Sequence, residues 1–167
     1  MMHKLGSVHV VDDNDDIRKM LTLVLEGRGY TVHTHHSGAA YLQAPATQAP
    51  HVMLLDVRMP GLGGLAVQQA MRERGLMVPV IFVSGHADVP IVVRAFKAGA
   101  CDFIEKPYND QLLLDSVQAA LEHAGLARQG DQALALVQAR IDGLTPRERD
   151  VFVPLAQGLN NREIAEQ

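Results

Sequence analysis

The chain contains 167 residues, of which 47% are hydrophobic and 20% are charged, and it carries a formal net charge of −4. This length suits one full domain and a small second piece with a sizeable core, and the negative charge gives no electrostatic reason to bind nucleic acid. The first apolar stretch is too short for a signal peptide and no later run approaches membrane-spanning length, so a cytoplasmic protein is expected.

Strand-like and helical patterns alternate along most of the chain. Strands are expected at Val8–Val11, Tyr30–His35, Val52–Leu55, Val80–Val83 and Phe103-Ile104. Helices are expected at 17–25, Ser37–Gln43, Gly64–Arg74, Asp88–Ala98 and Asp110–Leu121. Five such βα units with right-handed crossovers predict an α/β fold, a three-layer sandwich around a five-stranded parallel sheet. The expected strand order is the flavodoxin-like 2-1-3-4-5.

A second helical stretch follows the fifth unit, with Leu134, Val137 and Ile141 at helical spacing. Gly125 and Gly130 either break this helix or are absorbed in one long helix, at about 1 kcal/mol each relative to alanine. The sequence leaves both possibilities open. A helical linker is expected in either case.

Four of the expected strands end in polar residues. Val8–Val11 is followed by Asp12-Asp13, Val52–Leu55 by Asp56, Val80–Val83 by Ser84, and Phe103-Ile104 by Glu105-Lys106-Pro107. In open parallel sheets ligands bind beyond the carboxyl ends of the strands, and the expected order places the first and third strands at the switch point. The carboxylates, the hydroxyl and the ammonium should therefore converge on one cleft.

These side chains have the chemistry of a phosphoryl-transfer site. Three carboxylates in one cleft repel one another and need a cation, and Mg²⁺ prefers such oxygen ligands, so Asp12 and Asp13 are the expected metal pair. Asp56 is the expected nucleophile, giving an aspartyl phosphate while the metal and Lys106 neutralise the phosphoryl oxygens. Ser84 can hydrogen-bond a phosphoryl oxygen and so report phosphorylation.

Each of these residues also has an ordinary structural interpretation. Acidic residues after a strand cap helices, and Asp or Ser at strand ends are common turn residues. The right residue type at four strand ends favours the functional interpretation over the structural one.

The segments VVDDND, LLDVRMPGLGG, IFVSGHADVPIVVRAFKAGACDFIEKP and LTPRERDVF…NNREIA resemble a response regulator of the two-component FixJ type. The first three span the whole receiver domain. The resemblance implies that paired acids bind Mg²⁺ or Mn²⁺, that one aspartate takes phosphate from a partner histidine kinase, and that a hydroxyl, an aromatic ring and a lysine complete the switch. These roles fall on Asp12, Asp13, Asp56, Ser84, Phe103 and Lys106.

The resemblance implies a further metal ligand, the main-chain carbonyl of Arg58. It also implies a signalling switch with self-catalysed phosphoryl transfer and slow autodephosphorylation, and not an enzyme. Ser84 stands where threonine is commoner, and Phe103 stands where tyrosine is common and cannot form a hydroxyl hydrogen bond. The bond before Pro107 is expected to be cis on the same resemblance, the alternative being that Pro107 simply starts a loop.

Histidines invite two hypotheses. His33 and His35 project to one face of a strand and His36 follows, but a zinc site needs further ligands, so a polar strand at the sheet edge is the preferred interpretation. His86 lies two residues after Ser84, at the mouth of the expected cleft. We expect Arg58 and His86 to set the lifetime of the phosphorylated state by steering or excluding water.

Other residues carry smaller expectations. The single cysteine, Cys101, cannot form an internal disulfide and is expected to be a small buried residue. Ser84 and Phe103 border the face of the fourth helix, fifth strand and fifth helix, so a phosphorylation-favoured homodimer through that face is expected.

The C-terminal segment begins with a compact helix start, Thr145-Pro146-Arg147-Glu148, which matches a capping box. Gly158 is a plausible helix stop, and Asn160 and Glu163 repeat the cap pattern before NREIAEQ, as at the opening of a LuxR-type helix-turn-helix domain. The expected division is a receiver at 1–122, a helical linker at 123–143 and a DNA-binding fragment at 144–167. Because the recognition helix is missing and acids outnumber bases there, promoter DNA is expected as a partner of the full-length parent only.

Two other function classes use similar residues. A magnesium-dependent phosphohydrolase would also pass through an aspartyl phosphate, but it needs another acid or base beside its nucleophile, and the residues that follow Asp56 are Val57, Arg58, Met59 and Pro60. A flavin-binding module would need a phosphate-cradling loop after the first strand, where Asp12–Asp16 would repel phosphate.

Overall fold

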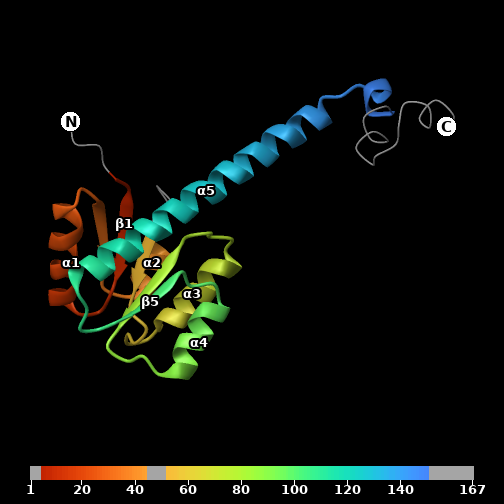
Figure 1. Cartoon of the computed structure of the whole chain (residues 1–167). Helices are drawn as coiled ribbons and strands as arrows, with labels where there is room; N and C mark the ends of the chain where they lie inside the picture. The colour runs from red at the N-terminus through yellow and green to blue at the C-terminus, as the bar shows by residue number, and fades with distance from the viewer. Residues whose placement is uncertain (1–4, 45–51, 151–167) are drawn as a thin grey trace. The chain divides into compact units, whose positions relative to one another are not determined.

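The computed structural model describes residues 5–44 and 52–150. Its centre is a five-stranded parallel sheet in the order β2-β1-β3-β4-β5, as predicted (Figure 1). The strands are β1 (Ser7–Val11), β2 (Thr31–His35), β3 (Val52–Leu55), β4 (Val80–Ser84) and β5 (Asp102–Glu105). The continuous apolar runs become the buried strands, because all of β3 and β4 is covered on both faces.

Five helices connect and follow the strands. They are α1 (Asp15–Gly27), α2 (Gly38–Gln43), α3 (Gly64–Glu73), α4 (Val89–Lys97) and α5 (Asp110–Asp142). The expected bounds of α1 to α4 are confirmed to within a few residues. Caps mark the ends: the Asn14 side chain accepts hydrogen bonds from the main-chain N–H groups at the start of α1, and Ser37 accepts one at the start of α2. Gly99, at φ 92°, follows the end of α4.

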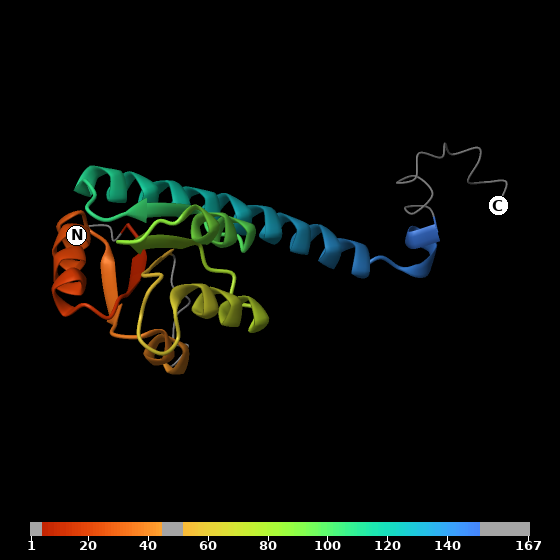
Figure 2. The ribbon, with the colours of Figure 1, turned by 90° about the horizontal axis from the view of Figure 1, so that it is seen from below.

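Helices cover both faces of the sheet, which gives the expected three layers. One core layer joins the sheet to α1 and α5 around Leu21, Leu25, Leu113 and Val117. The other joins it to α2, α3 and α4 through residues such as Tyr41, Val67, Met71 and Ala95. Figure 2 shows the sheet between α5 and α3. This packing fixes the strand ends, from which the site is built.

The expectation that Cys101 is buried is wrong. Its side chain is exposed in the turn that leads from α4 into β5. The chain leaves α4 through Gly99 and directs Ala100 into the core, so the next residue faces outward.

The final helix runs without a break from Asp110 to Asp142 and absorbs both Gly125 and Gly130. The chain divides into two compact units, residues 1–125 and 126–167. In the second unit the Thr145 hydroxyl accepts from the Glu148 N–H at 3.3 Å, and the Thr145 N–H donates to the Glu148 carboxylate at 2.8 Å. The predicted capping box is therefore confirmed. The bonds that the Thr145 N–H and hydroxyl donate to the carboxylate lower the pKa of Glu148.

The remaining expectations for the C-terminal segment, which concern Gly158, Asn160, Glu163 and the missing recognition helix, lie outside the described residues. Within the parts of the chain that the structure describes, no helix combines the length and the apolar character needed to cross a bilayer.

The edge of the sheet carries a histidine with a depressed pKa. Burial, together with the neighbouring His35 and His33, lowers the pKa of His9 from 6.5 to about 4. Between about pH 6.5 and pH 4 the folded chain therefore binds fewer protons at His9 than the unfolded chain does. The contribution of His9 to the free energy of unfolding is complete above about pH 6.5 and is lost as the pH falls toward 4.

We expect His9→Gln to flatten this acid-side loss. Because the ring is only half-buried, the His9 contribution should be on the order of 1 kcal/mol once solvent screening is included. Urea unfolding of both proteins at neutral and mildly acidic pH measures it. Equal pH dependence in the two proteins would contradict the assignment to His9.

Candidate functional site

Three carboxylates from two neighbouring strands meet at one edge of the sheet. Oxygen atoms of Asp12, Asp13 and Asp56 all lie within 4.8 Å of one another, and no other such group of metal-binding side chains occurs among the described residues. Asp12 and Asp56 are buried and Asp13 is exposed. The main-chain N–H of Asp56 donates to the Val11 carbonyl at 2.9 Å, which continues the pairing of β3 with β1 into the site. The predicted convergence of the acids is confirmed.

Lys106 reaches this cluster from the end of β5. Its Nζ donates to Asp12 Oδ2 at 2.8 Å, while its main-chain N–H donates to the Ser84 carbonyl at 2.9 Å. The other oxygen of Asp12 accepts from the Asn14 N–H at 2.8 Å. The bond between Lys106 and Pro107 is cis, as expected. Both carboxylate oxygens of Asp12 are thus engaged, one of them by the predicted phosphoryl clamp.

The environment of Asp56 disfavours its ionised form. Burial raises the pKa of Asp56; Lys106 opposes this, nearby Asp12 adds to it, and the main-chain N–H of Arg58 lowers it by hydrogen-bonding the carboxylate. A cation among the three acids would relieve this repulsion. The donor set, all carboxylate oxygens, fits a hard divalent ion such as Mg²⁺.

Arg18 is a positioning residue that the sequence did not reveal. From α1 its Nη1 donates to the main-chain carbonyl of Asp12 at 2.7 Å, and its Nη2 donates to Asp15 Oδ1 at 2.8 Å. The side chain is mostly covered. This contact fixes the loop that carries the acidic pair. The available signal was the place of Arg18 one helical turn after the Asn14 cap, on the side of α1 that faces back toward the strand end.

The two expected switch residues lie on adjacent strands. Ser84 is buried at the end of β4, and its hydroxyl oxygen accepts from the His86 N–H at 3.3 Å. Phe103 on β5 is half-buried and is paired in register with Phe82, with ring centroids 6.0 Å apart. The serine is at the site and the phenylalanine lies two positions before the strand end.

The two expected modulators lie at the rim of the site and are exposed. The Arg58 guanidinium forms an ion pair with Asp88 Oδ2 at 3.5 Å and so links the loop after β3 to the start of α4. The His86 side chain is exposed two residues after Ser84. Their role in the lifetime of the phosphorylated state stays a prediction.

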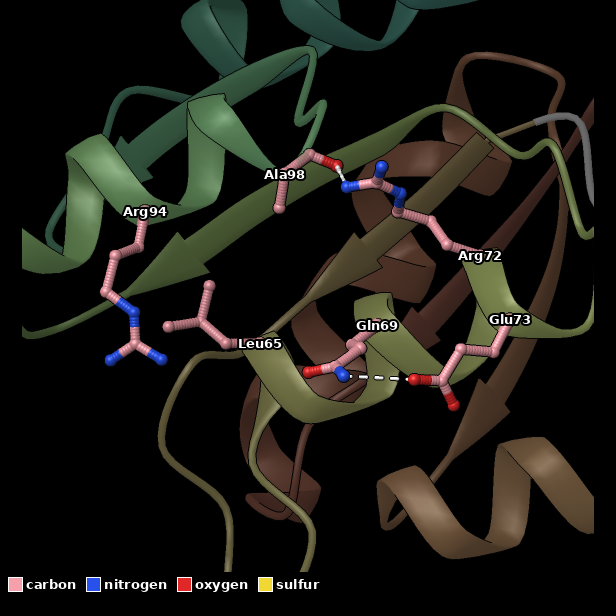
Figure 3. Close-up of a pocket in the computed structure, with 6 residues that line it drawn as sticks. All are labelled: Leu65, Gln69, Arg72, Glu73, Arg94 and Ala98. Carbon is pink, nitrogen blue, oxygen red and sulfur yellow. Dashed lines mark hydrogen bonds between the residues drawn. The ribbon is translucent and has the colours of Figure 1, made fainter.

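A separate hollow lies between α3 and α4. Figure 3 shows its lining, in which Gln69 donates to Glu73 at 3.0 Å and Arg72 donates to the Ala98 carbonyl at 3.3 Å. Six residues line it: Leu65, Gln69, Arg72, Glu73, Arg94 and Ala98. None of the acids, the lysine or the serine of the site belongs to this lining, so it plays no part in the chemistry described above.

The family model for the response regulator receiver domain matches residues 8–118. The chain belongs to this family. The residues matched begin in β1 and end in α5, so they include every strand end that forms the site. The resemblance seen in the sequence motifs is confirmed.

Relatives extend the likeness beyond the receiver. The chain is 41% identical to the transcriptional regulatory protein FixJ of Azorhizobium caulinodans, over 95% of this chain and 75% of that protein. It is 40% identical to the C4-dicarboxylate transport transcriptional regulatory protein DctR of Rhodobacter capsulatus, over 96% of this chain and 83% of that one.

Solved structures agree with this assignment. The response regulator StyR superposes with a TM-score of 0.82 at 33% identity, over 96% of this chain and 81% of that one. Full-length FixJ from B. japonicum gives a TM-score of 0.72 at 34% identity, over 98% and 81% of the two chains. The protein is therefore a receiver-containing transcriptional response regulator of the FixJ and DctR type. The hydrolase and flavin-module hypotheses find no support in these relatives.

Proposed function

We propose that Asp56 is the phosphoacceptor of this response regulator and takes a phosphoryl group from a histidine kinase in a Mg²⁺-dependent reaction. The observation that supports this most directly is the set of three carboxylates within 4.8 Å of one another, with Lys106 bonded to one of them. Phosphoryl transfer to a side chain needs a nucleophilic carboxylate, a metal site built from oxygen ligands, and a positively charged side chain such as Lys106.

In the proposed reaction a carboxylate oxygen of Asp56 forms a bond to phosphorus as the bond between phosphorus and the kinase histidine nitrogen breaks. The Lys106 ammonium gives up its hydrogen bond to Asp12 and donates to a phosphoryl oxygen, whose negative charge it neutralises. Asp12, Asp13, Asp56 and the Arg58 main-chain carbonyl would hold Mg²⁺, or Mn²⁺, which when bound offsets the negative charge of the phosphoryl oxygens. Arg18 keeps the acidic loop in position.

The proposed switch then starts at Ser84. Its hydroxyl, whose oxygen accepts from the His86 N–H, donates its hydrogen to a phosphoryl oxygen. This draws the start of the loop before α4 toward the site, and Phe103 on the adjacent strand repacks with it. The face formed by α4, β5 and α5 changes as a result, and a homodimer is favoured. We assign residues 1–122 to the receiver, 123–143 to the linker and 144–167 to the N-terminal part of a LuxR-type helix-turn-helix domain, with promoter DNA as a partner of the full-length parent protein.

Incubation with acetyl phosphate and Mg²⁺, followed by intact mass measurement, tests the phosphoacceptor. We expect one added phosphoryl group on the native chain and none on Asp56→Asn. Asp131→Asn, which removes an exposed carboxylate on α5, is the matched control and should be phosphorylated normally. Phosphorylation of Asp56→Asn to the native level would refute the assignment, and continuous turnover of phosphate esters would favour a hydrolase instead.

We further propose that Arg58 and His86 slow the loss of the phosphoryl group. Replacing either by alanine uncovers the mouth of the site, so the aspartyl phosphate should decay several-fold faster in each variant. Radiolabel release from phosphorylated protein gives the rates. Asp88→Asn separates the two possible roles of Arg58, because it removes the ion pair and leaves the guanidinium in place. Unchanged decay in both alanine variants would end the idea.

A further inference from the structure

Three histidines from two adjacent strands gather on one side of the sheet edge. His9 on β1 is the register partner of His33 on β2, and His35 lies two residues further along β2, so all three side chains leave the sheet on the same face. The His9 ring centroid is 4.8 Å from that of His33 and 5.1 Å from that of His35. The sequence pointed to His33 and His35, with His36 following; the topology supplies His9 as a third imidazole on their face.

Two of the rings face each other through their nitrogens. His9 Nδ1 and His35 Nε2 are 2.9 Å apart, and the ring planes differ by 11°. The centroid separation exceeds the nitrogen separation by about two ring radii, so the rings lie edge to edge in nearly one plane. The two nitrogens therefore share one proton, with one acting as donor and the other as acceptor.

The imidazoles are kept in the form that binds metals. Burial and the neighbouring histidines lower the pKa of His9 to about 4 and also lower the pKa of His35, so both rings are neutral near pH 7. Tyr41 from α2 contacts both rings edge-on, with centroids 5.8 and 5.2 Å away, and supports them from one side. The nitrogens of the three imidazoles do not all lie within the 4.8 Å that joins the oxygens of the acidic cluster, so the exposed His33 ring must turn toward the pair to complete a site.

We propose that His9, His33 and His35 form a binding site for one divalent transition-metal ion of the class that prefers imidazole nitrogen, such as Zn²⁺ or Ni²⁺. The ion replaces the proton shared by His9 and His35 as their rings turn, and His33 rotates to add a third nitrogen, with water completing the coordination. The proton displaced from the shared position moves through solvent to the other nitrogen of the same imidazole, so both rings stay neutral and no net proton is released. The ligand chemistry differs from that of the oxygen-only site at Asp56, so the two sites select different ions.

The site would stabilise the edge strand. β2 is held in the sheet by β1 alone among the strands, and a metal bridge between them adds a second restraint. The same edge reaches the acidic site, because the Asp12 N–H donates to the His35 carbonyl at 3.2 Å. An ion bound to the histidines would therefore support the strand that flanks Asp12.

Isothermal titration of the full chain with Zn²⁺ and, separately, Ni²⁺ tests the site, with millimolar Mg²⁺ present to occupy the acids. We expect one ion per chain, and a loss of affinity of at least about tenfold in His9→Gln and in His33→Gln. His123→Gln, which removes an exposed imidazole on α5, is the matched control and should bind as the native chain does. Asp56→Asn should also bind normally, which keeps this test independent of phosphorylation.

Thermal unfolding provides the second measurement. Zn²⁺ should raise the melting temperature of the native chain and of His123→Gln, and should leave that of His9→Gln unchanged. Because His33 is exposed, His33→Gln keeps the packed core intact, so lost binding in that variant cannot be attributed to unfolding. The proposal would be overturned by no saturable binding to the native chain, by native affinity in His9→Gln or His33→Gln, or by loss of binding in Asp56→Asn alone.

Discussion

Replacing Gly64 with alanine is expected to destabilise the receiver by about 3 kcal/mol and to impair its phosphorylation. A Cβ at this position would lie 2.2 Å from the main-chain carbonyl oxygen of Asp56 and 3.0 Å from the Phe82 ring. The oxygen belongs to the backbone of a buried strand end and cannot move away as a flexible side chain would. The first turn of α3, or Asp56 itself, must therefore shift.

Urea unfolding and acetyl phosphate labelling of Gly64→Ala measure both effects. The matched control is Gly27→Ala in α1, where no atom lies within 4 Å of the added Cβ. That substitution should be neutral or stabilising by about 0.5–1 kcal/mol, because alanine loses less conformational entropy in a helix. If Gly64→Ala is as stable as the native chain and is phosphorylated at the native rate, the close approach of α3 to Asp56 is not required.

The second large effect is expected for Lys106→Met. Loss of the ammonium should slow phosphorylation about 10²–10³-fold, the usual cost of removing one charge-stabilising group from a transition state. It also leaves the buried carboxylate of Asp12 without its ion-pair partner, at a cost of about 2–3 kcal/mol, which is below the value for a fully buried pair because the lysine side chain is 21% exposed. The pKa of Asp56 should rise further, since Lys106 opposes the effect of burial.

These two effects can be separated with Mg²⁺. Saturating Mg²⁺ binds the folded acids and should restore much of the lost stability, while the labelling rate stays low. Lys97→Met, which removes an exposed lysine from α4, controls for the change of charge and should show neither effect. A native labelling rate in Lys106→Met would mean that the ammonium does not act on the phosphoryl group.

The fold followed from the sequence because β1, β3, β4 and β5 contain short apolar runs that end in polar residues, and β3 and β4 are buried throughout. The order of the sheet and the meeting of Asp12, Asp13 and Asp56 needed only the rules for parallel sheets and right-handed crossovers. Helix ends have local causes. The side chains of Asn14 and Ser37 accept hydrogen bonds from main-chain N–H groups at helix starts, and Gly99 adopts a positive φ just after a helix end. The capping box at Thr145 was visible for the same local reason.

Contacts between distant segments were not accessible in this way. The tie from Arg18 to the Asp12 carbonyl depends on the rotation of α1 about its axis, and the pair of His9 with His35 depends on the register of two strands 26 residues apart in the chain. Whether Gly125 and Gly130 would break the last helix could not be decided from the sequence, because each glycine costs only about 1 kcal/mol relative to alanine in a helix. The expectation for Cys101 failed because the turn after α4 directs Ala100, and not the cysteine, inward.

The bond between Lys106 and Asp12 has a consequence for the resting protein. The ammonium is already satisfied by an internal counter-ion before any donor arrives. An incoming phosphoryl group must therefore compete with Asp12 for the same positive charge. In the unmodified protein the Lys106 ammonium is bound to Asp12 and is not available to anions in solution. Free phosphate in solution would bind weakly, because the charge of Lys106 is already neutralised by Asp12. A phosphoryl group attached to Asp56 has a high local concentration and can displace Asp12 from the ammonium.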